Sequence, residues 1–278
     1  MDLRSMTSSA QLERAKQLAM RGLFNYQPFQ LSDGFYCGAG LSIVQGFRVD
    51  PPTVYCPSLD PAMSEYAASA LAKPTDRDEF LRANEALDAF YDGVIRQISE
   101  HLGGVADTSV LDVGCNAGYF PVAFHRAGAK QSIGYDRIDY TETIALLNEI
   151  CGARAQFKVW DYHGELEAKE QHDLVLSVAV LVHLSEPLRH LAWLGSAAKK
   201  ALFVLTPCHR DDDLSIRYHT VNRYYSNKFP NCFDVTTLSR KLLYLAFEQM
   251  GFSKVVELST SPMSQPWQDT HLALLGIR

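Results

Sequence analysis

Several features that would point to other classes of protein are missing from this 278-residue chain. Its six cysteines form no C-x-x-C pair, so neither a zinc ribbon nor a dithiol redox motif is indicated. No run approaches about 18 apolar residues, and the N-terminus has no apolar signal-peptide core. We therefore expect a cytoplasmic protein without a membrane span. Its thiols should be free in a reducing compartment: Cys37, Cys56, Cys115, Cys151, Cys208 and Cys232.

An excess of basic charge is also absent. The chain has 26 Lys and Arg against 32 Asp and Glu, a net charge of −6. Binding to phosphates favours a basic surface, so this balance argues mildly against a nucleic-acid partner, although a local basic patch would suffice for one. Hydrophobic residues make up 47% of the chain, which is enough for a full core.

The first 104 residues are expected to form an N-terminal cap. Residues 9–21 have the apolar spacing of a short amphipathic helix, and residues 62–72 are helix-compatible. Residues 23–58, rich in aromatics, Gly and Pro, are typical of irregular or hairpin structure. Apolar residues recur at helical spacing over residues 77–102, and Gly103-Gly104 should end that long helix.

Residues 105–278 alternate between strand and helix patterns, which predicts a parallel sheet with helices on both faces. A last helix at about 234–250 is followed by two strands, 254–258 and 271–277, with no helix between them, so these two must be antiparallel. The earlier strands are expected at 109–113, 132–136, 156–160, 173–181 and 201–206, with helices near 117–127, 140–151 and 186–197.

The most informative stretch is a strand, a glycine turn and a helix start at residues 109–120. Such a turn is expected to offer backbone N–H groups and a helix N-terminus to a nucleotide-like ligand, its glycines allowing close approach. The turn, Gly114-x-x-x-Gly118, lacks the G-x-G-x-x-G spacing of dinucleotide binders, so a dehydrogenase is a distant alternative. With Asp112 before it and Asn116 within it, the turn resembles motif I of class I S-adenosylmethionine (SAM) dependent methyltransferases.

That resemblance implies an α/β fold: a Rossmann-like, seven-stranded, mostly parallel sheet with an antiparallel last strand, plus the N-terminal cap. It also implies S-adenosyl-L-methionine as cofactor, with Asp136 accepting from the ribose hydroxyls and Asp161 from the adenine amino group. Taken singly, these acids could instead cap the loop, cap a helix or sit in a turn. The implied cofactor-binding residues are Asp112, Gly114, Cys115, Asn116, Ala117, Gly118, Asp136, Arg137, Asp161, Tyr162 and Val178.

Residues 178–188, VAVLVHLSEPL, resemble a narrower branch with the pattern Gly-Val-Leu-Tyr-His-Leu-x-x-Pro-Leu. This branch contains the tRNA wobble-uridine carboxymethyl transferase and related methyltransferases of small molecules. The Tyr before the His helps the carboxymethyl enzyme to hold carboxylated SAM, and Val182 stands there in this chain. Ordinary SAM is therefore the expected cofactor.

His183 is the candidate general base, by position and by its titration range, although a structural role in its loop is an alternative. A lid is expected at about residues 207–232, where basic and aromatic residues interleave; a plain surface loop is the alternative. Asp211, Asp212 and Asp213 suggest a solvated turn, and no metal is expected. The candidate substrate-binding residues are Tyr26, Arg217, Tyr218, His219, Arg223 and Tyr224.

The leading hypothesis is a SAM-dependent methyltransferase that acts on an oxygen or nitrogen of a small-molecule methyl acceptor. A tRNA-modifying enzyme of the same branch is the second, and a non-catalytic SAM-binding scaffold is the third. The sequence leaves the acceptor and the oligomeric state open, a homodimer being one option.

Overall fold

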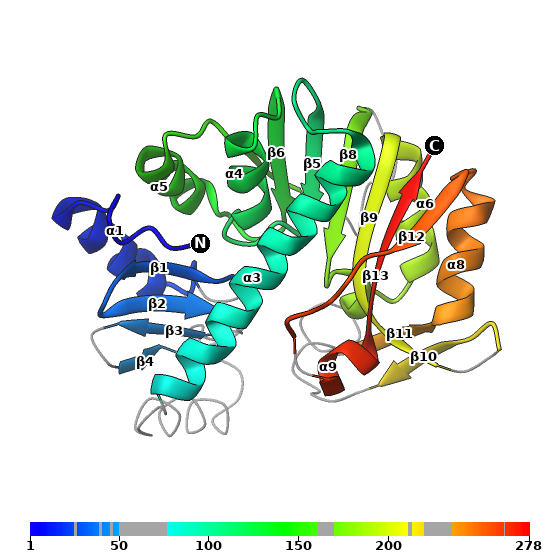
Figure 1. Cartoon of the computed structure of the whole chain (residues 1–278). Coiled ribbons are helices and arrows are strands. Elements are labelled where there is room, and N and C mark those ends of the chain that lie inside the picture. Colours follow the sequence, from blue (N-terminus) through cyan, green and yellow to red (C-terminus); the bar gives the residue numbers. More distant parts are fainter. Residues whose placement is uncertain are drawn as a thin grey trace.

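The structure, a computed structural model, describes residues 1–24, 27–38, 41–44, 47–49, 77–160, 170–210, 213–219, 235–263 and 265–278. A small N-terminal sheet and a large central sheet lie side by side, and the long helix α3 (Arg77–Leu102) runs across both (Figure 1). The predicted limits of this helix are confirmed to the residue.

Five parallel strands form the middle of the central sheet in the order β7-β6-β5-β8-β9. The apolar, β-branched runs predict all five strands, and the predicted bounds 109–113 of the strand before the glycine turn are confirmed to the residue. Because β5 lies between β6 and β8, the chain reverses its direction of winding at β5, which is where α/β sheets bind ligands. The strands are β5 (Ser109–Val113), β6 (Gln131–Asp136), β7 (Gln156–Val159), β8 (His172–Val178) and β9 (Ala198–His209).

The last two strands complete the predicted seven. Strand β13 (His271–Ile277) runs antiparallel to β9 along residues 201–207, and β12 (Lys254–Glu257) pairs antiparallel with the outer edge of β13. The predicted antiparallel pairing is therefore confirmed, and β13 is inserted between β9 and β12, which both precede it in the sequence. The expectation that no helix separates the last two strands is wrong, because the short helix α9 (Gln265–Thr270) lies between them.

One expectation about the segment that follows the lid region is wrong. The helix expected at 234–250 begins only at Arg240, because residues 235–239 form strand β11 (Val235–Ser239). The β-branched run Val-Thr-Thr favours a strand, and Ser239 then caps helix α8 (Arg240–Gln249) by accepting from the Leu242 N–H. Strand β11 pairs with Cys208 and His209 of β9 and with β10 (Ile216–His219), which extends the sheet beyond the predicted seven strands.

Helices cover both faces of the central sheet, as the alternating pattern predicts (Figure 1). Helices α4 (Tyr119–Arg126) and α5 (Thr141–Cys151) pack on one face and α6 (Pro187–Ala197) with α8 on the other. Within the described ranges, no helix has the length and apolar character needed to cross a membrane. Cys37, Cys115, Cys151 and Cys208 are free and buried there.

The N-terminal part contains helix α1 (Ser9–Met20) and an antiparallel sheet in the predicted hairpin region. Rings of Phe24, Phe29 and Phe35 meet edge-to-face in its core, and Phe29 also packs against Tyr119 of α4. The N-terminal residues thus share one hydrophobic core with the central sheet. The helix predicted at 62–72 lies outside the described residues. The sheet contains β1 (Phe29–Ser32), β2 (Phe35–Gly38), β3 (Leu41–Val44) and β4 (Phe47–Val49).

Directly after β8 the backbone takes a conformation that an alanine rarely adopts. Ala179 has φ +57°, in the left-handed region, while its N–H donates to the Leu205 carbonyl at 2.8 Å. In the methyltransferase branch that residues 178–188 resemble, the pattern has Gly at this position. A Cβ in the left-handed region costs on the order of 1–2 kcal/mol, so the end of β8 is held by its surroundings against a local strain.

We predict that Ala179→Gly raises the free energy of unfolding by about 0.5–1 kcal/mol, because the strain relieved exceeds the added entropy of the unfolded glycine. Ala123→Gly, within α4, is the matched control and should lower that free energy by about 1 kcal/mol. Urea unfolding of both variants measures the difference. Equal destabilisation in the two variants would contradict the strain at Ala179.

Candidate functional site

The predicted cofactor-binding residues that the structure describes gather at the carboxyl ends of β5, β6 and β8. Asp112 lies in β5, Asp136 ends β6 and Val178 ends β8. The glycine turn after β5 is bound to the neighbouring strand, because the N–H groups of Gly114 and Cys115 both donate to the Tyr135 carbonyl. The sequence therefore brings two of its three predicted acids together beside the turn.

The hydrogen bonds of the turn differ from the expectation that it offers N–H groups to a ligand. Every backbone N–H from Gly114 to Tyr119 already has an acceptor within the protein. Gly118, the N-cap of α4, has no side chain to cap the helix, and the amide of Gln27 accepts from the Tyr119 N–H at 2.9 Å instead. The other acceptors are the carbonyls of Tyr135 and Cys115 and the side chains of Asp136 and Asn116.

Packing inside the protein requires glycine at both ends of the turn. A Cβ on Gly114 would lie 2.2 Å from the Cγ2 of Val180, and one on Gly118 would lie 2.5 Å from the Cγ1 of Ile144. Both glycines also have left-handed φ angles, +76° and +93°. They let the turn pack against the segment after β8 and against α5.

Asp112 is a buried carboxyl group without a hydrogen-bond partner among the described residues. It is 1% exposed, and neither of its side-chain oxygens is bonded. Burial, followed by repulsion from the Asp136 charge, raises the pKa of Asp112 well above its usual value. Such a group lowers the free energy of unfolding unless a hydrogen-bond donor or a cation faces it. Buried, unbonded carboxyl groups of this kind are typical of binding sites.

Asp136 is also buried, but its oxygens are bonded. One accepts from the Asn116 N–H at 2.9 Å and the other from the Ile138 N–H at 3.0 Å. Burial raises the pKa of Asp136, although these two bonds and the neighbouring Arg137 oppose the shift. Arg137 is half-buried beside it. The site is therefore rich in hydrogen-bond acceptors and negative charge.

Cys115 is wholly buried in the turn, next to both carboxylates. Burial is the largest cause that raises the pKa of its thiol well above the usual range. The thiol therefore stays protonated, which fits a packing role rather than a nucleophile. Its sulfur occupies the space that a Cβ on Gly134 would need.

Two predicted cofactor residues, Asp161 and Tyr162, lie outside the described part of the chain, shortly after β7 in the sequence. The described chain reaches Trp160, whose N–H donates to the Asp136 carbonyl at 2.8 Å and whose ring stacks on Trp193 of α6. The segment that leads to Asp161 and Tyr162 thus leaves the sheet directly beside Asp136.

His183 is exposed on a short 3₁₀ turn, η1 (Leu181–His183), which follows β8. The strands of the lid region are attached to the residues after this turn. The Tyr218 hydroxyl donates to the Ser185 carbonyl at 3.0 Å, and the Thr236 hydroxyl donates to the Leu184 carbonyl at 2.8 Å. Candidate substrate residues on β10 are thereby placed close to the turn that carries His183.

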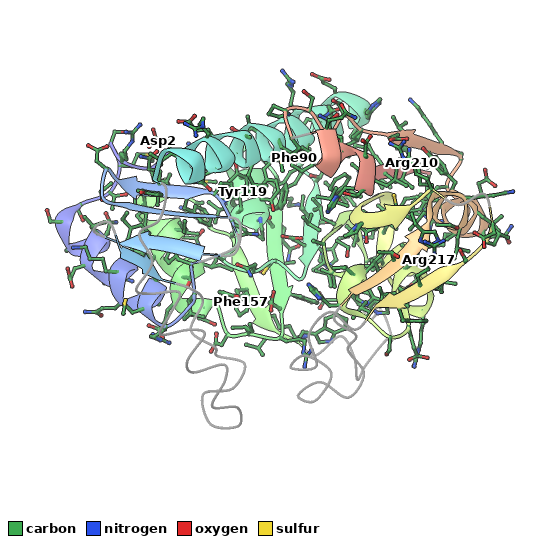
Figure 2. All side chains as sticks on the ribbon, turned by 90° about the horizontal axis from the view of Figure 1, so that it is seen from below. Asp2, Phe90, Tyr119, Phe157, Arg210 and Arg217 are labelled. Carbon is green, nitrogen blue, oxygen red and sulfur yellow. The ribbon has the colours of Figure 1, made fainter. Side chains whose placement is uncertain are left out.

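The remaining candidate substrate residues are only partly described. Arg217 is exposed on β10, on the right-hand side of the view in Figure 2, and His219 ends the same strand. Tyr26, Arg223 and Tyr224 lie outside the described residues. Sequence reasoning missed Gln27, which contacts both ends of the turn. Nothing in the sequence distinguishes Gln27 from the nearby polar residues Asn25 and Gln30.

Comparison with known proteins adds a family and a fold. A family model described as "Methyltransferase domain" matches residues 66–258. The tRNA U34 carboxymethyltransferase of Campylobacter concisus is 26% identical over 197 residues, covering 68% of this chain and 67% of that protein. The enzyme of that name from Haemophilus influenzae is 26% identical over 177 residues, covering 61% of this chain and 53% of that protein. The chain thus spans between half and two thirds of the length of these relatives.

Two solved structures share the fold. The N-terminal domain of EvdMO1 with SAH bound has a TM-score of 0.56 at 17% identity, covering 98% of each chain. Magnesium protoporphyrin IX methyltransferase (ChlM) from Synechocystis PCC 6803 with bound SAH has a TM-score of 0.51 at 16% identity, covering 78% of this chain and 94% of that one. The predicted fold class is confirmed.

We predict that Asp112→Asn stabilises the ligand-free protein. The pKa of Asp112 is higher in the folded state, so as the pH rises above about 4 the unfolded chain loses its proton first. The free energy of unfolding therefore falls with rising pH until the folded carboxyl ionises too. The variant loses this decline and should gain at least about 1 kcal/mol near pH 7, but nothing below about pH 3.

Urea unfolding across this pH range measures the effect. Asp107→Asn is the matched control, because Asp107 is exposed and its left-handed φ of +60° suits Asn equally well. If Asp112→Asn shifts stability no more than Asp107→Asn does, then the buried carboxyl does not carry the proposed electrostatic cost.

Proposed function

Because the chain belongs to the methyltransferase-domain family and is a SAM-dependent enzyme of class I, we propose that it transfers a methyl group to an oxygen or nitrogen of a small molecule. The hydrogen bonds of the glycine turn carry the assignment of the cofactor site. Dinucleotides are held through their phosphates by N–H groups at such turns. Here the N–H groups from Gly114 to Tyr119 are already used, while Asp112 and Asp136 supply negative charge.

An acceptor-rich, negatively charged site suits a ligand that brings cations and hydroxyl donors. SAM carries a sulfonium, an ammonium and two ribose hydroxyls; when bound, it supplies a methyl group activated by the positive sulfur. Asp112 would face the cationic part, because its two oxygens are buried and unbonded among the described residues. Asp136 would accept from the ribose hydroxyls through the lone pairs that its two backbone bonds leave open.

The other proposed cofactor residues surround these two acids. The turn residues Gly114, Cys115, Asn116, Ala117 and Gly118 would border the methionine part, and Val178 would line the methyl side at the end of β8. Arg137 would flank the adenosine. Asp161 would accept from the adenine amino group, with Tyr162 next to it.

On the acceptor side, His183 is proposed as the general base. It is exposed on η1, beside the end of β8, and an imidazole can remove a proton from a hydroxyl or ammonium near neutral pH. Arg217 and Tyr218 on β10, with His219, Arg223, Tyr224 and Tyr26, are proposed to line the acceptor pocket. The net charge of −6 favours a small molecule over a nucleic acid.

A tRNA-modifying activity is the second candidate. The relatives named tRNA U34 carboxymethyltransferase support it, at 26% identity. Val182 in place of the Tyr of that branch favours ordinary SAM. A gel shift with tRNA at low salt separates the two candidates, because phosphate contacts are strongest there. A specific shift that weakens steeply with added salt would favour tRNA over a small molecule.

We predict that isothermal titration detects binding of SAM and S-adenosylhomocysteine (SAH) but not of NAD. Asp136→Ala should weaken SAH binding at least about tenfold, as expected when a buried charged acceptor is removed. Asp33→Ala, on the exposed N-terminal hairpin, should leave the affinity unchanged. The cofactor assignment fails if the wild-type protein binds neither SAM nor SAH, or if Asp136→Ala binds as tightly as the wild type.

A further inference from the structure

Gln27 makes an unusual pair of contacts with the glycine turn. Its side chain is buried, 5% exposed, and lies in the N-terminal segment just before β1. Its amide nitrogen donates to the Cys115 carbonyl at 2.9 Å, and its amide oxygen accepts from the Tyr119 N–H at 2.9 Å. One side chain therefore connects the two ends of the turn. Gln27 also lies outside residues 66–258, which match the family model.

These two hydrogen bonds restrain the backbone of the turn where it passes the carboxyl groups of Asp112 and Asp136. Asn116 lies between the two contact points, and its N–H donates to Asp136. The Cys115 carbonyl accepts from Gly118 as well as from Gln27, so both of its lone pairs are used. The position of the turn, and with it the orientation of Asp136, thus depends on a side chain about 90 residues away in sequence.

The same contact leads into the packing between the N-terminal sheet and α3. The Tyr119 ring packs against Phe29 of β1 and Tyr91 of α3, and the single proton of its hydroxyl is shared between the carboxylates of Asp88 at 2.6 Å and Asp92 at 2.9 Å. In Figure 2, Tyr119 lies beside the N-terminal strands and close to α3. Polar contacts with Gln27, Asp88 and Asp92, together with tilted and edge-to-face ring contacts, therefore join the N-terminal part to Tyr119, the first residue of α4.

We infer that Gln27 is a positioning residue for the cofactor site, which couples the docking of the N-terminal sheet to cofactor affinity. This inference rests on the proposed SAM site. When the N-terminal sheet is docked, Gln27 holds the turn in the form that places Asp136 beside Asp112. Coupling is reciprocal, so a bound cofactor must in turn stabilise the docked N-terminal sheet.

Gln27→Met tests the coupling, because Met has a similar volume but makes neither hydrogen bond. The control is Gln17→Met on the exposed face of α1. We expect Gln27→Met to weaken SAH binding about tenfold by isothermal titration, as follows from losing two ordinary hydrogen bonds. Gln17→Met should bind SAH like the wild type.

Hydrogen exchange distinguishes positioning from a general loss of stability. In the wild type and in Gln17→Met, saturating SAH should slow amide exchange both in the turn, residues 114–118, and in β1 and β2, residues 29–38. In Gln27→Met, saturating SAH should still slow exchange in the turn but no longer in residues 29–38. A merely structural Gln27 would speed exchange with and without SAH and leave the protection by SAH unchanged.

Gln27→Glu is the second variant, in case Gln27→Met does not fold. An ionised glutamate keeps the acceptor for the Tyr119 N–H but places an oxygen without a proton against the Cys115 carbonyl, so SAH binding weaker than that of the wild type is expected. The inference is overturned if a folded Gln27 variant binds SAH within twofold of the wild type, or if SAH still protects residues 29–38 in it. If the folded wild-type protein binds no SAH, the proposed function fails first, and the inference fails with it.

Discussion

The candidate site depends on one constraint: every backbone N–H group from Gly114 to Tyr119 donates to an acceptor within the protein. Tyr135, Cys115, Asp136, Asn116 and Gln27 supply the acceptors. With its donors bonded internally, the turn cannot bind phosphate in the manner of dinucleotide folds. Next to it stands the buried carboxyl of Asp112, whose cost in stability is tolerable where a cationic ligand offsets it. In the proposed SAM site, the α/β scaffold would therefore select its ligand by which of its polar groups are left unbonded.

Much of the fold could be predicted because local pattern and burial agree. Strands β5 and β13 and helix α3 have the predicted bounds, since each is a strongly periodic or β-branched segment that ends at polar or glycine-containing sequence. The sequence does not predict strand β11, because Val235–Ser239 is short and runs directly into α8, and its apolar residues Val235 and Leu238 also fit helical spacing. These residues form a strand because they pair with β9 and β10. The local sequence pattern does not reveal such tertiary contacts.

The candidate site likewise contains features that the sequence predicts and features that it does not. The topology of a parallel sheet is enough to predict that Asp112 and Asp136 meet, since both stand at the carboxyl ends of adjacent strands. The roles of the two glycines could not be predicted in the same way. Their contacts are with Val180 and Ile144, which reach the turn only through tertiary packing. Gln27 lies still further away in sequence, and a lone glutamine carries no pattern from which its two partners could be inferred.

The placement of β13 and Gln27 has a consequence for any shortened form of this protein. A chain trimmed to residues 66–258 would keep the whole family match but would lose both. The edge of β9 that now pairs with residues 271–277 would be left open to other strands, a ready template for aggregation. The carbonyl of Cys115 and the N–H of Tyr119 would each lose a partner. The recognisable domain is thus smaller than the unit that can be cut out and handled alone.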